Sequence, residues 1–267
     1  VVISKFNNHP SLKADYTLSG NEIINENGDK SAIFTLTDFK TSDNEPVFLK
    51  LNYNQLNNNT IALLKSNPNI VILLESAHIN PVGEHRAFIH ALMQEQCKTP
   101  VIAVGKYNEN NLEALQIKAS ADLGIIFVDG LADGILILNE GSIDEKDVLS
   151  LSFGILQAAR VRVSKTEFIS CPGCGRTMFN LQTVIARIKA KTSHLTGLKI
   201  GIMGCIVNGP GEMADADYGY VGAGRGKVSL YKKHHCIEKN VPEEEAVDKL
   251  IELIKLNGDW TEPENAI

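Results

Sequence analysis

Short apolar runs alternate with amphipathic stretches along the first 140 residues of the chain. Several of the runs are almost continuously apolar, as strands buried on both faces should be. The stretches between them favour helices; in one, Phe88, Ile89 and Leu92 fall at helical spacing. Repeated strand–helix units predict parallel strands with right-handed crossovers. The predicted strands are residues 32–36, 47–51, 70–74, 101–104, 124–128 and 134–138, and the predicted helices are residues 55–66, 85–96 and 110–120.

This pattern predicts an α/β fold whose first part is a partial, barrel-like (β/α) domain or an open doubly wound sheet. Asp144 is expected to cap a helix that runs to about residue 163, and the polar run 162–167 marks a domain boundary. We therefore expect domains at residues 1–163 and 164–260, followed by a tail at 261–267. The second domain should contain a helix capped by Asn180, strands at 198–203, 217–222 and 226–231, and a closing helix at 243–256.

Composition narrows the class of protein. The chain is 43% hydrophobic and 22% charged, which is typical of a soluble globular protein, and its net charge of −6 disfavours nucleic-acid binding. No apolar run approaches the roughly 18–20 residues of a membrane span. Five cysteines are too few for a disulfide framework, so we expect a reducing cytoplasm. The opening Val-Val-Ile-Ser, without a methionine, indicates a strand entered midway and hence a piece of a longer protein.

Three cysteines and one glutamate are the candidate chemistry. Cys171 and Cys174 form a C-x-x-C pair in a loop rich in glycine and proline, and Cys205 and Glu212 occupy a second loop of the same kind. Thiolates select zinc or iron–sulfur centres. Three thiolates beside a carboxylate favour an iron–sulfur cluster with one labile corner, while a structural zinc site with a fourth ligand elsewhere stays open. Glycines at 173, 175, 204, 209 and 211 would permit positive φ and a close approach to something bulky.

Two motifs identify a family. Ser-Cys-Pro-x-Cys-Gly-Arg-Thr at 170–177 and Met-Gly-Cys-x-Val-Asn-Gly-Pro-Gly-Glu at 203–212 resemble the C-terminal domain of 4-hydroxy-3-methylbut-2-enyl diphosphate synthases of the non-mevalonate isoprenoid pathway. The resemblance runs from about Asp144 to Trp260. The first 140 residues resemble the extra middle domain of the larger, plant-type members. The chain is thus similar to a C-terminal fragment of that large form.

The resemblance implies a site, a reaction and partners. A 4Fe–4S cluster would take Cys171, Cys174, Cys205 and Glu212, in a domain similar to modules of sulfite and nitrite reductases. Asn208 would lie near substrate, and Arg176 would pair with the diphosphate or with a loop carbonyl. The implied reaction is the reductive ring opening of 2-C-methyl-D-erythritol 2,4-cyclodiphosphate to hydroxymethylbutenyl diphosphate, with ferredoxin or flavodoxin as electron donor. The location would be cytoplasmic in a bacterium and plastidic in a plant-like source.

The remaining polar groups carry simpler interpretations. Cys97 and Cys236 are expected to be bystander thiols. Asp129 follows the predicted strand 124–128, where barrel enzymes place catalytic groups, and it resembles a glutamate of the family's catalytic barrel. Residues 1–140 contain no clustered arginines or lysines for a diphosphate, so we expect a non-catalytic spacer. Because the parent's diphosphate-binding barrel is missing, the fragment alone should be inactive. A zinc-stabilised binding module and an electron-transfer domain without its own substrate remain alternatives.

Overall fold

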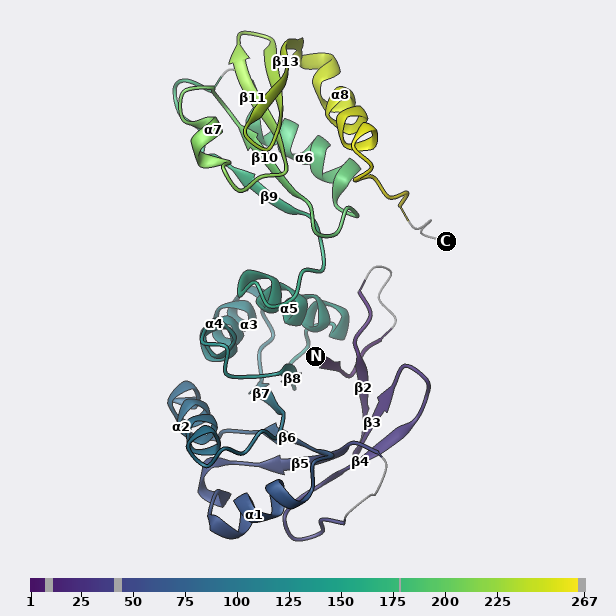
Figure 1. The fold of residues 1–267 in the computed structure, drawn as a ribbon, viewed down its shortest axis with the longest axis vertical. Helices are drawn as coiled ribbons and strands as arrows, with labels where there is room; N and C mark the ends of the chain where they lie inside the picture. Colours follow the sequence, from purple (N-terminus) through teal and green to yellow (C-terminus); the bar gives the residue numbers. More distant parts are fainter. Residues whose placement is uncertain (8–11, 41–44, 178, 264–267) are drawn as a thin grey trace. The chain divides into compact units, whose positions relative to one another are not determined.

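A computed structural model describes residues 1–7, 12–40, 45–177 and 179–263. The chain divides into two compact units, residues 1–163 (the first unit) and residues 164–267 (the second unit), which are labelled element by element in Figure 1. Each unit is described by itself.

The first unit is built on a closed barrel of eight strands. Parallel pairing of β8 with β1 closes the ring. Within the described residues, β3 is antiparallel to both of its neighbours, and the remaining neighbouring strands pair in parallel. The expected barrel is therefore present, but it is closed instead of partial, and it contains a β-meander. The strands are β1 (Val2–Ser4), β2 (Tyr16–Ser19), β3 (Glu22–Asn25), β4 (Lys30–Phe34), β5 (Val47–Leu51), β6 (Ile70–Leu74), β7 (Val101–Tyr107) and β8 (Gly134–Asn139).

Helices cover the outside of this barrel. Alternate strand residues such as Phe48, Leu73 and Val104 fill its interior, while their neighbours Leu49, Leu74 and Ala103 pack outward against helices. This two-sided burial explains why β5, β6 and β7 are almost continuously apolar in sequence. The helices are η1 (Tyr53–Gln55), α1 (Asn58–Ser66), α2 (Pro81–Gln94), α3 (Leu112–Ala119), η2 (Ser120–Gly124), α4 (Ile125–Val128) and α5 (Glu145–Ala158). As predicted, the Asp144 side chain caps α5 by accepting from the Lys146 N–H at 2.9 Å.

The predicted strand at residues 124–128 is wrong. This segment ends η2, a π-helical turn, and forms α4, where Ile126 and Phe127 are buried. A short apolar run has no periodicity that separates a buried strand from a buried helix. Asp129 therefore follows a helix and not a barrel strand, and its Oδ2 accepts from Arg86 Nε at 2.7 Å. The expectation that Asp129 lies at the end of a barrel strand is therefore wrong.

The second unit is a five-stranded sheet in the order β13-β12-β11-β10-β9. In Figure 1, α6 and α8 lie on one side of this sheet, where Ile188 and Leu250 pack against Ile200 and Tyr220. Met203, Met213 and Val221 pack together in a separate, smaller cluster. The elements are β9 (Glu167–Ser170), α6 (Leu181–Thr192), β10 (Lys199–Met203), α7 (Gly209–Glu212), β11 (Tyr218–Gly224), β12 (Lys227–Lys232), β13 (His235–Pro242) and α8 (Glu243–Leu256). The sequence did not predict β9, α7 or β13.

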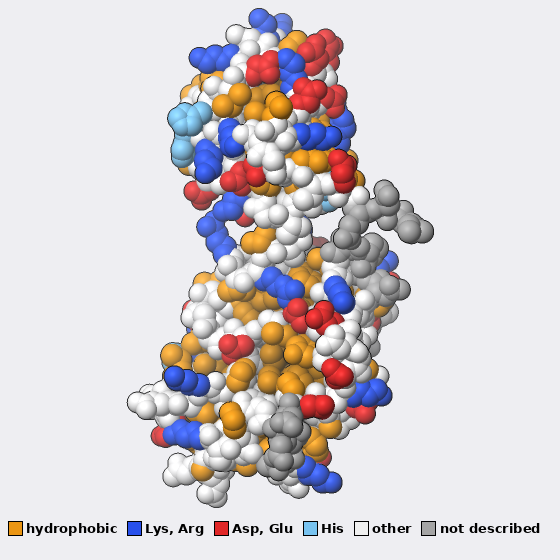
Figure 2. Space-filling view, turned by 45° about the vertical axis from the view of Figure 1, so that its right-hand side comes forward, with side chains coloured by type: hydrophobic (Ala, Val, Ile, Leu, Met, Phe, Trp, Pro, Cys, Tyr) orange, Lys and Arg blue, Asp and Glu red, His pale blue; other side chains and the backbone are white. Residues whose placement is uncertain are grey.

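The surface carries charges of both signs. On the face drawn in Figure 2, lysine and arginine side chains are interspersed with aspartate and glutamate over both units, in keeping with the net charge of −6. Among the residues that the structure describes, no helix is both long enough and apolar enough to cross a membrane.

Candidate metal centre

Two neighbouring parallel strands bring the cysteine loops together. β9 and β10 pair in parallel with Ser170 opposite Ile202. Cys171 directly follows β9, and Cys205 comes two residues after the end of β10. The carboxyl ends of parallel strands lie at one edge of a sheet, so both loops leave the sheet at the same level. The backbone N–H of Gly204 donates to the Cys171 sulfur at 3.2 Å, which joins the two loops directly.

All of the predicted site residues line one cavity. Its volume is about 190 Å³. The short helix α7 turns the second loop back toward it: the Gly209 N–H donates to the Cys205 carbonyl at 3.3 Å, and the Glu212 N–H donates to the Asn208 carbonyl at 2.9 Å. Cys174 is exposed, whereas Cys171 and Cys205 are half-buried. The predicted residues on the cavity wall are Cys171, Cys174, Arg176, Cys205, Asn208 and Glu212.

Thr177 holds the C-x-x-C turn in shape, a role that the sequence analysis missed. The Cys174 N–H donates to Thr177 Oγ1 at 3.0 Å, and the Thr177 N–H donates to the Cys174 carbonyl at 2.9 Å. Gly173 has φ +81°, a conformation that favours glycine. A hydroxyl residue three positions after a loop cysteine was the available signal, because serine and threonine bond nearby backbone N–H groups in turns.

Two glycines let the site segments approach one another. A Cβ on Gly204 would lie 2.7 Å from Thr177 Oγ1, and a Cβ on Gly222 of β11 would lie 2.4 Å from the Gly204 carbonyl oxygen. Neither position can hold a side chain without movement. In contrast, a Cβ on Gly175 or Gly211 would meet no described atom within 4 Å. The close approach expected of the loop glycines is thus made to the protein itself, at Gly204 and also at Gly209, where a Cβ would lie 2.8 Å from the Cβ of Met203.

Arg176 sets the electrostatics of the cavity. Its backbone N–H and then its guanidinium donate to the Cys174 sulfur, and they hold the pKa of that thiol below its usual value. The pKa of Arg176 is raised in turn, first by this hydrogen bond and then by the charges of Cys174, Cys205 and Glu212. The guanidinium therefore stabilises the thiolate form, which is the form that binds metals.

The chemistry of the residues on the cavity fits the ligand set of a 4Fe–4S cluster. Among the described residues, no three histidine, cysteine, aspartate or glutamate side chains converge tightly enough to hold one metal ion. A structural zinc ion needs four ligands within about 2.0–2.3 Å of one point. A 4Fe–4S cluster instead takes each ligand on a different iron, so its ligands surround a cavity. Three thiols and a carboxylate around the cavity fit that requirement.

The two other cysteines are not among the residues that line the cavity. Cys97 is buried in the first unit with its sulfur 3.3 Å from Thr99 Oγ1. Cys236 is half-buried, and its thiol donates to the Glu238 carbonyl at 3.7 Å. Neither lines the cavity, as expected of bystander thiols.

Comparison with known proteins finds relatives of both units. Over 215 residues the chain is 62% identical to the 4-hydroxy-3-methylbut-2-en-1-yl diphosphate synthase (flavodoxin) of Phocaeicola vulgatus, a match that covers 80% of this chain and 35% of that protein. Proteins of the same name are 60% identical over 220 residues in Bacteroides fragilis (82% and 35% covered) and 49% identical over 197 residues in Protochlamydia amoebophila (74% and 29% covered).

The chain thus spans about a third of the length of the curated relatives it matches. Since 80% of this chain is longer than the 163 residues of the first unit, the match reaches into both units. Residues 167–256 match the GcpE protein C-terminal domain. The resemblance predicted from the two cysteine motifs is confirmed by this match and by the similarity to the named relatives.

Proposed function

We propose that the second unit holds a 4Fe–4S cluster and serves as the cluster-bearing part of a 4-hydroxy-3-methylbut-2-enyl diphosphate synthase. The thiolates of Cys171, Cys174 and Cys205 would bind three irons, and the Glu212 carboxylate would bind the fourth. The single observation that carries this proposal is that all four residues line one cavity of about 190 Å³. The unit would resemble the cluster modules of sulfite and nitrite reductases.

The proposed reaction opens 2-C-methyl-D-erythritol 2,4-cyclodiphosphate with two electrons and two protons, giving hydroxymethylbutenyl diphosphate and water. Bound in the cavity, the cluster would supply electrons and a Lewis-acidic iron. The relatives are named with flavodoxin, so we propose flavodoxin as the electron donor, and the bacterial cytoplasm as the location.

The cavity residues have distinct roles in this proposal. A carboxylate is a harder and weaker ligand for iron than a thiolate, so Glu212 marks the corner at which a substrate oxygen binds most easily. Arg176 offers a cation for a phosphate oxygen. Asn208 begins α7 but its side chain makes no capping hydrogen bond, which leaves the amide for substrate.

The first unit would be a spacer in this scheme, and the substrate's diphosphate would bind to a catalytic barrel elsewhere in the full-length protein. About two thirds of the length of the relatives lies outside the match. The chain by itself should therefore bind a cluster without turning over the cyclodiphosphate.

Reconstitution under anaerobic conditions tests the cluster directly. The chain should bind about four irons and four sulfides and gain visible charge-transfer absorbance. Cys171→Ala, Cys174→Ala and Cys205→Ala should each lower the iron content strongly. Cys236→Ala is the matched control, because its thiol lies in the same unit but does not line the cavity. Wild-type iron content in Cys205→Ala, or one zinc per chain in place of iron, would refute the assignment.

A further inference from the structure

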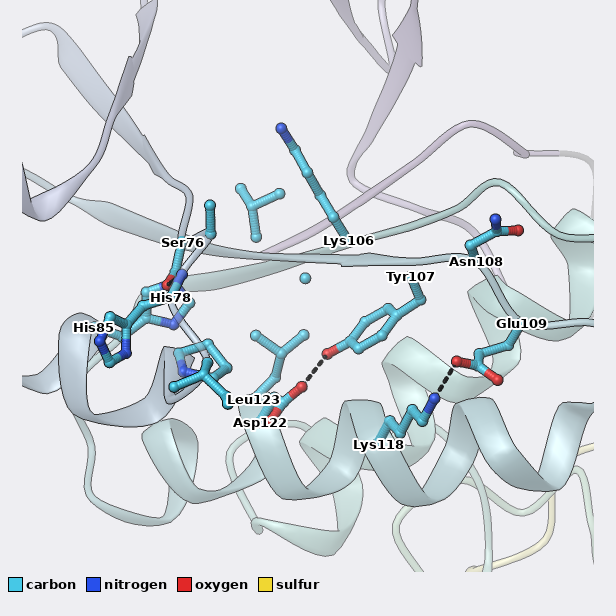
Figure 3. A pocket seen from close by; sticks show the side chains of 15 residues that line it. Ser76, His78, His85, Lys106, Tyr107, Asn108, Glu109, Lys118, Asp122 and Leu123 are labelled. Carbon is cyan, nitrogen blue, oxygen red and sulfur yellow. Dashed lines mark hydrogen bonds and ion pairs between the residues drawn. The ribbon is translucent and has the colours of Figure 1, made fainter.

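A polar cavity of about 410 Å³ lies at the carboxyl ends of β6 and β7 in the first unit (Figure 3). Its walls come from the loop after β6, the end of β7, and the helices α2, α3 and η2. In β/α barrels the loops at this end of the strands carry the ligand-binding groups. The volume falls within the roughly 300–1,000 Å³ of small-molecule sites.

His85 on this cavity lacks a hydrogen-bond partner. Its side chain projects from α2, is 1% exposed and lines the cavity. Neither Nδ1 nor Nε2 is hydrogen-bonded to any residue that the structure describes. Buried polar atoms are nearly always paired. Burial also lowers the pKa of His85, so its ring is neutral and presents one donor and one acceptor. A hydroxyl group, which both donates and accepts, matches such a ring.

A hydrogen-bonded pair of polar side chains, Tyr107 and Asp122, is fixed beside the same cavity. Tyr107 folds back over its own strand, where a Cβ on Gly105 would lie 2.7 Å from the phenol oxygen. The Tyr107 hydroxyl donates to Asp122 Oδ2 at 3.2 Å, as drawn in Figure 3. Asp122 belongs to the π-helical η2, a distortion that often marks functional sites. The glycine and the π-turn together hold a phenol and a carboxylate at the cavity wall.

The cations of the cavity are already neutralised. Lys118 pairs with Glu109, and Lys106 Nζ lies 2.6 Å from Glu75 Oε2. Figure 3 shows Lys106 pointing away from the Tyr107–Asp122 pair. Within the described lining, each lysine is thus matched by a carboxylate. An anion such as phosphate would have to break these ion pairs to gain a charge-assisted bond.

We propose that this cavity binds a small uncharged molecule with several hydroxyl groups, of monosaccharide size, whose hydroxyls bond to the His85 ring and to the Tyr107–Asp122 pair. The site is separate from the metal centre and does not depend on it. The first unit is then a ligand-binding domain in addition to any role as a spacer.

Nuclear magnetic resonance on the iron-free chain tests this site. D-glucose, D-ribose and myo-inositol are titrated while the ring nitrogens of His85 are observed; their signals are assigned by their loss in His85→Phe. At least one of the three should give a saturable shift, with a Kd on the order of 1 mM. His85→Phe lacks this reporter ring, so its binding is measured from the proton signals of the added polyol, and it should be weaker by at least about tenfold. His90→Phe, on the exposed face of the same helix, should not change it.

Further arms of the experiment can overturn the proposal. Tyr107→Phe removes only the hydroxyl group and keeps the aromatic ring of residue 107, so it tests the site even if His85→Phe does not fold. It should weaken binding at least about threefold. Inorganic phosphate and glycine serve as anionic and zwitterionic probes and should not shift His85. The proposal fails if none of the three polyols shifts the His85 ring, if phosphate or glycine alone does so, or if Tyr107→Phe binds as the wild type.

Discussion

Gly222→Ala should destabilise the second unit and disturb its candidate metal centre. The added Cβ would lie 2.4 Å from the Gly204 carbonyl oxygen and 3.1 Å from Cε1 of Phe179. The first of these neighbours is backbone, which cannot turn aside as the end of a side chain can. The loop that carries Cys205 must therefore move. Overpacking of a buried site typically costs about 1–3 kcal/mol, and we expect the upper half of that range here.

The fluorescence of Trp260 provides the assay, because Trp260 is the only tryptophan of the chain and packs against the hydrophobic core of the second unit. Its ring centroid is 5.0 Å from that of His194, so its fluorescence reports the unfolding of this unit in urea. With a urea dependence of about 1–2 kcal/mol per molar, a loss of about 2–3 kcal/mol lowers the midpoint by roughly 1–3 M. The iron content after reconstitution should fall as well.

Gly224→Ala is the matched control in the same strand. A Cβ at this position would meet no described atom within 4 Å. The substitution should be neutral or stabilise the unit by up to about 1 kcal/mol, because alanine restricts the unfolded chain. Equal midpoints and equal iron content for the two alanine variants would refute the reasoning from close backbone approach.

Three further predictions concern single side chains. Glu212→Cys should retain iron longer against a chelator but lower the turnover of the full-length enzyme; unchanged turnover with intact iron would remove Glu212 from the mechanism. Thr177→Val removes the acceptor for the Cys174 N–H and should lower the stability of the second unit by about 1 kcal/mol, measured by Trp260 fluorescence in urea, whereas Thr177→Ser should match the wild type. Burial lowers the pKa of His85 in the folded chain from its ordinary value of 6.5. Below that pH the unfolded chain therefore binds more protons than the folded chain. The contribution of the neutral His85 ring to the free energy of unfolding is complete above pH 6.5 and declines as the pH falls. His85→Leu should remove this decline in urea titrations followed by circular dichroism, and an identical pH profile would contradict it.

The sequence predicted the elements whose signal is local. β5 and β6 are apolar runs with clear limits, and α8 has a strong amphipathic pattern; all three were predicted with the observed bounds. β13 was missed because most of its side chains are polar and exposed, as at a sheet edge. Closure of the barrel was missed because β1 and β8 pair across more than 130 residues of sequence, a contact that no local pattern encodes.

The two candidate sites likewise differ in how local their sequence signal is. The candidate ligands that line the second unit's cavity could be named from the sequence because they are concentrated in two short motifs, whereas the packing roles of Thr177 and Gly222 depend on which segments meet. The cavity beside His85 is assembled from single polar residues on several elements. A search for clustered arginines and lysines could not detect it, because its lysines are few and paired.

The core of the second unit bears on how the protein would mature. The side chains that join the sheet to α6 and α8 are aliphatic and aromatic, and no cysteine is among them. Zinc fingers fold only when the metal arrives, because the metal replaces a core. Here the sheet alone brings the loops of Cys171 and Cys205 side by side. For the cluster proposed above, a newly made chain would therefore already have its binding cavity formed before iron and sulfide arrive, and a chain that lost the cluster could be reloaded without refolding.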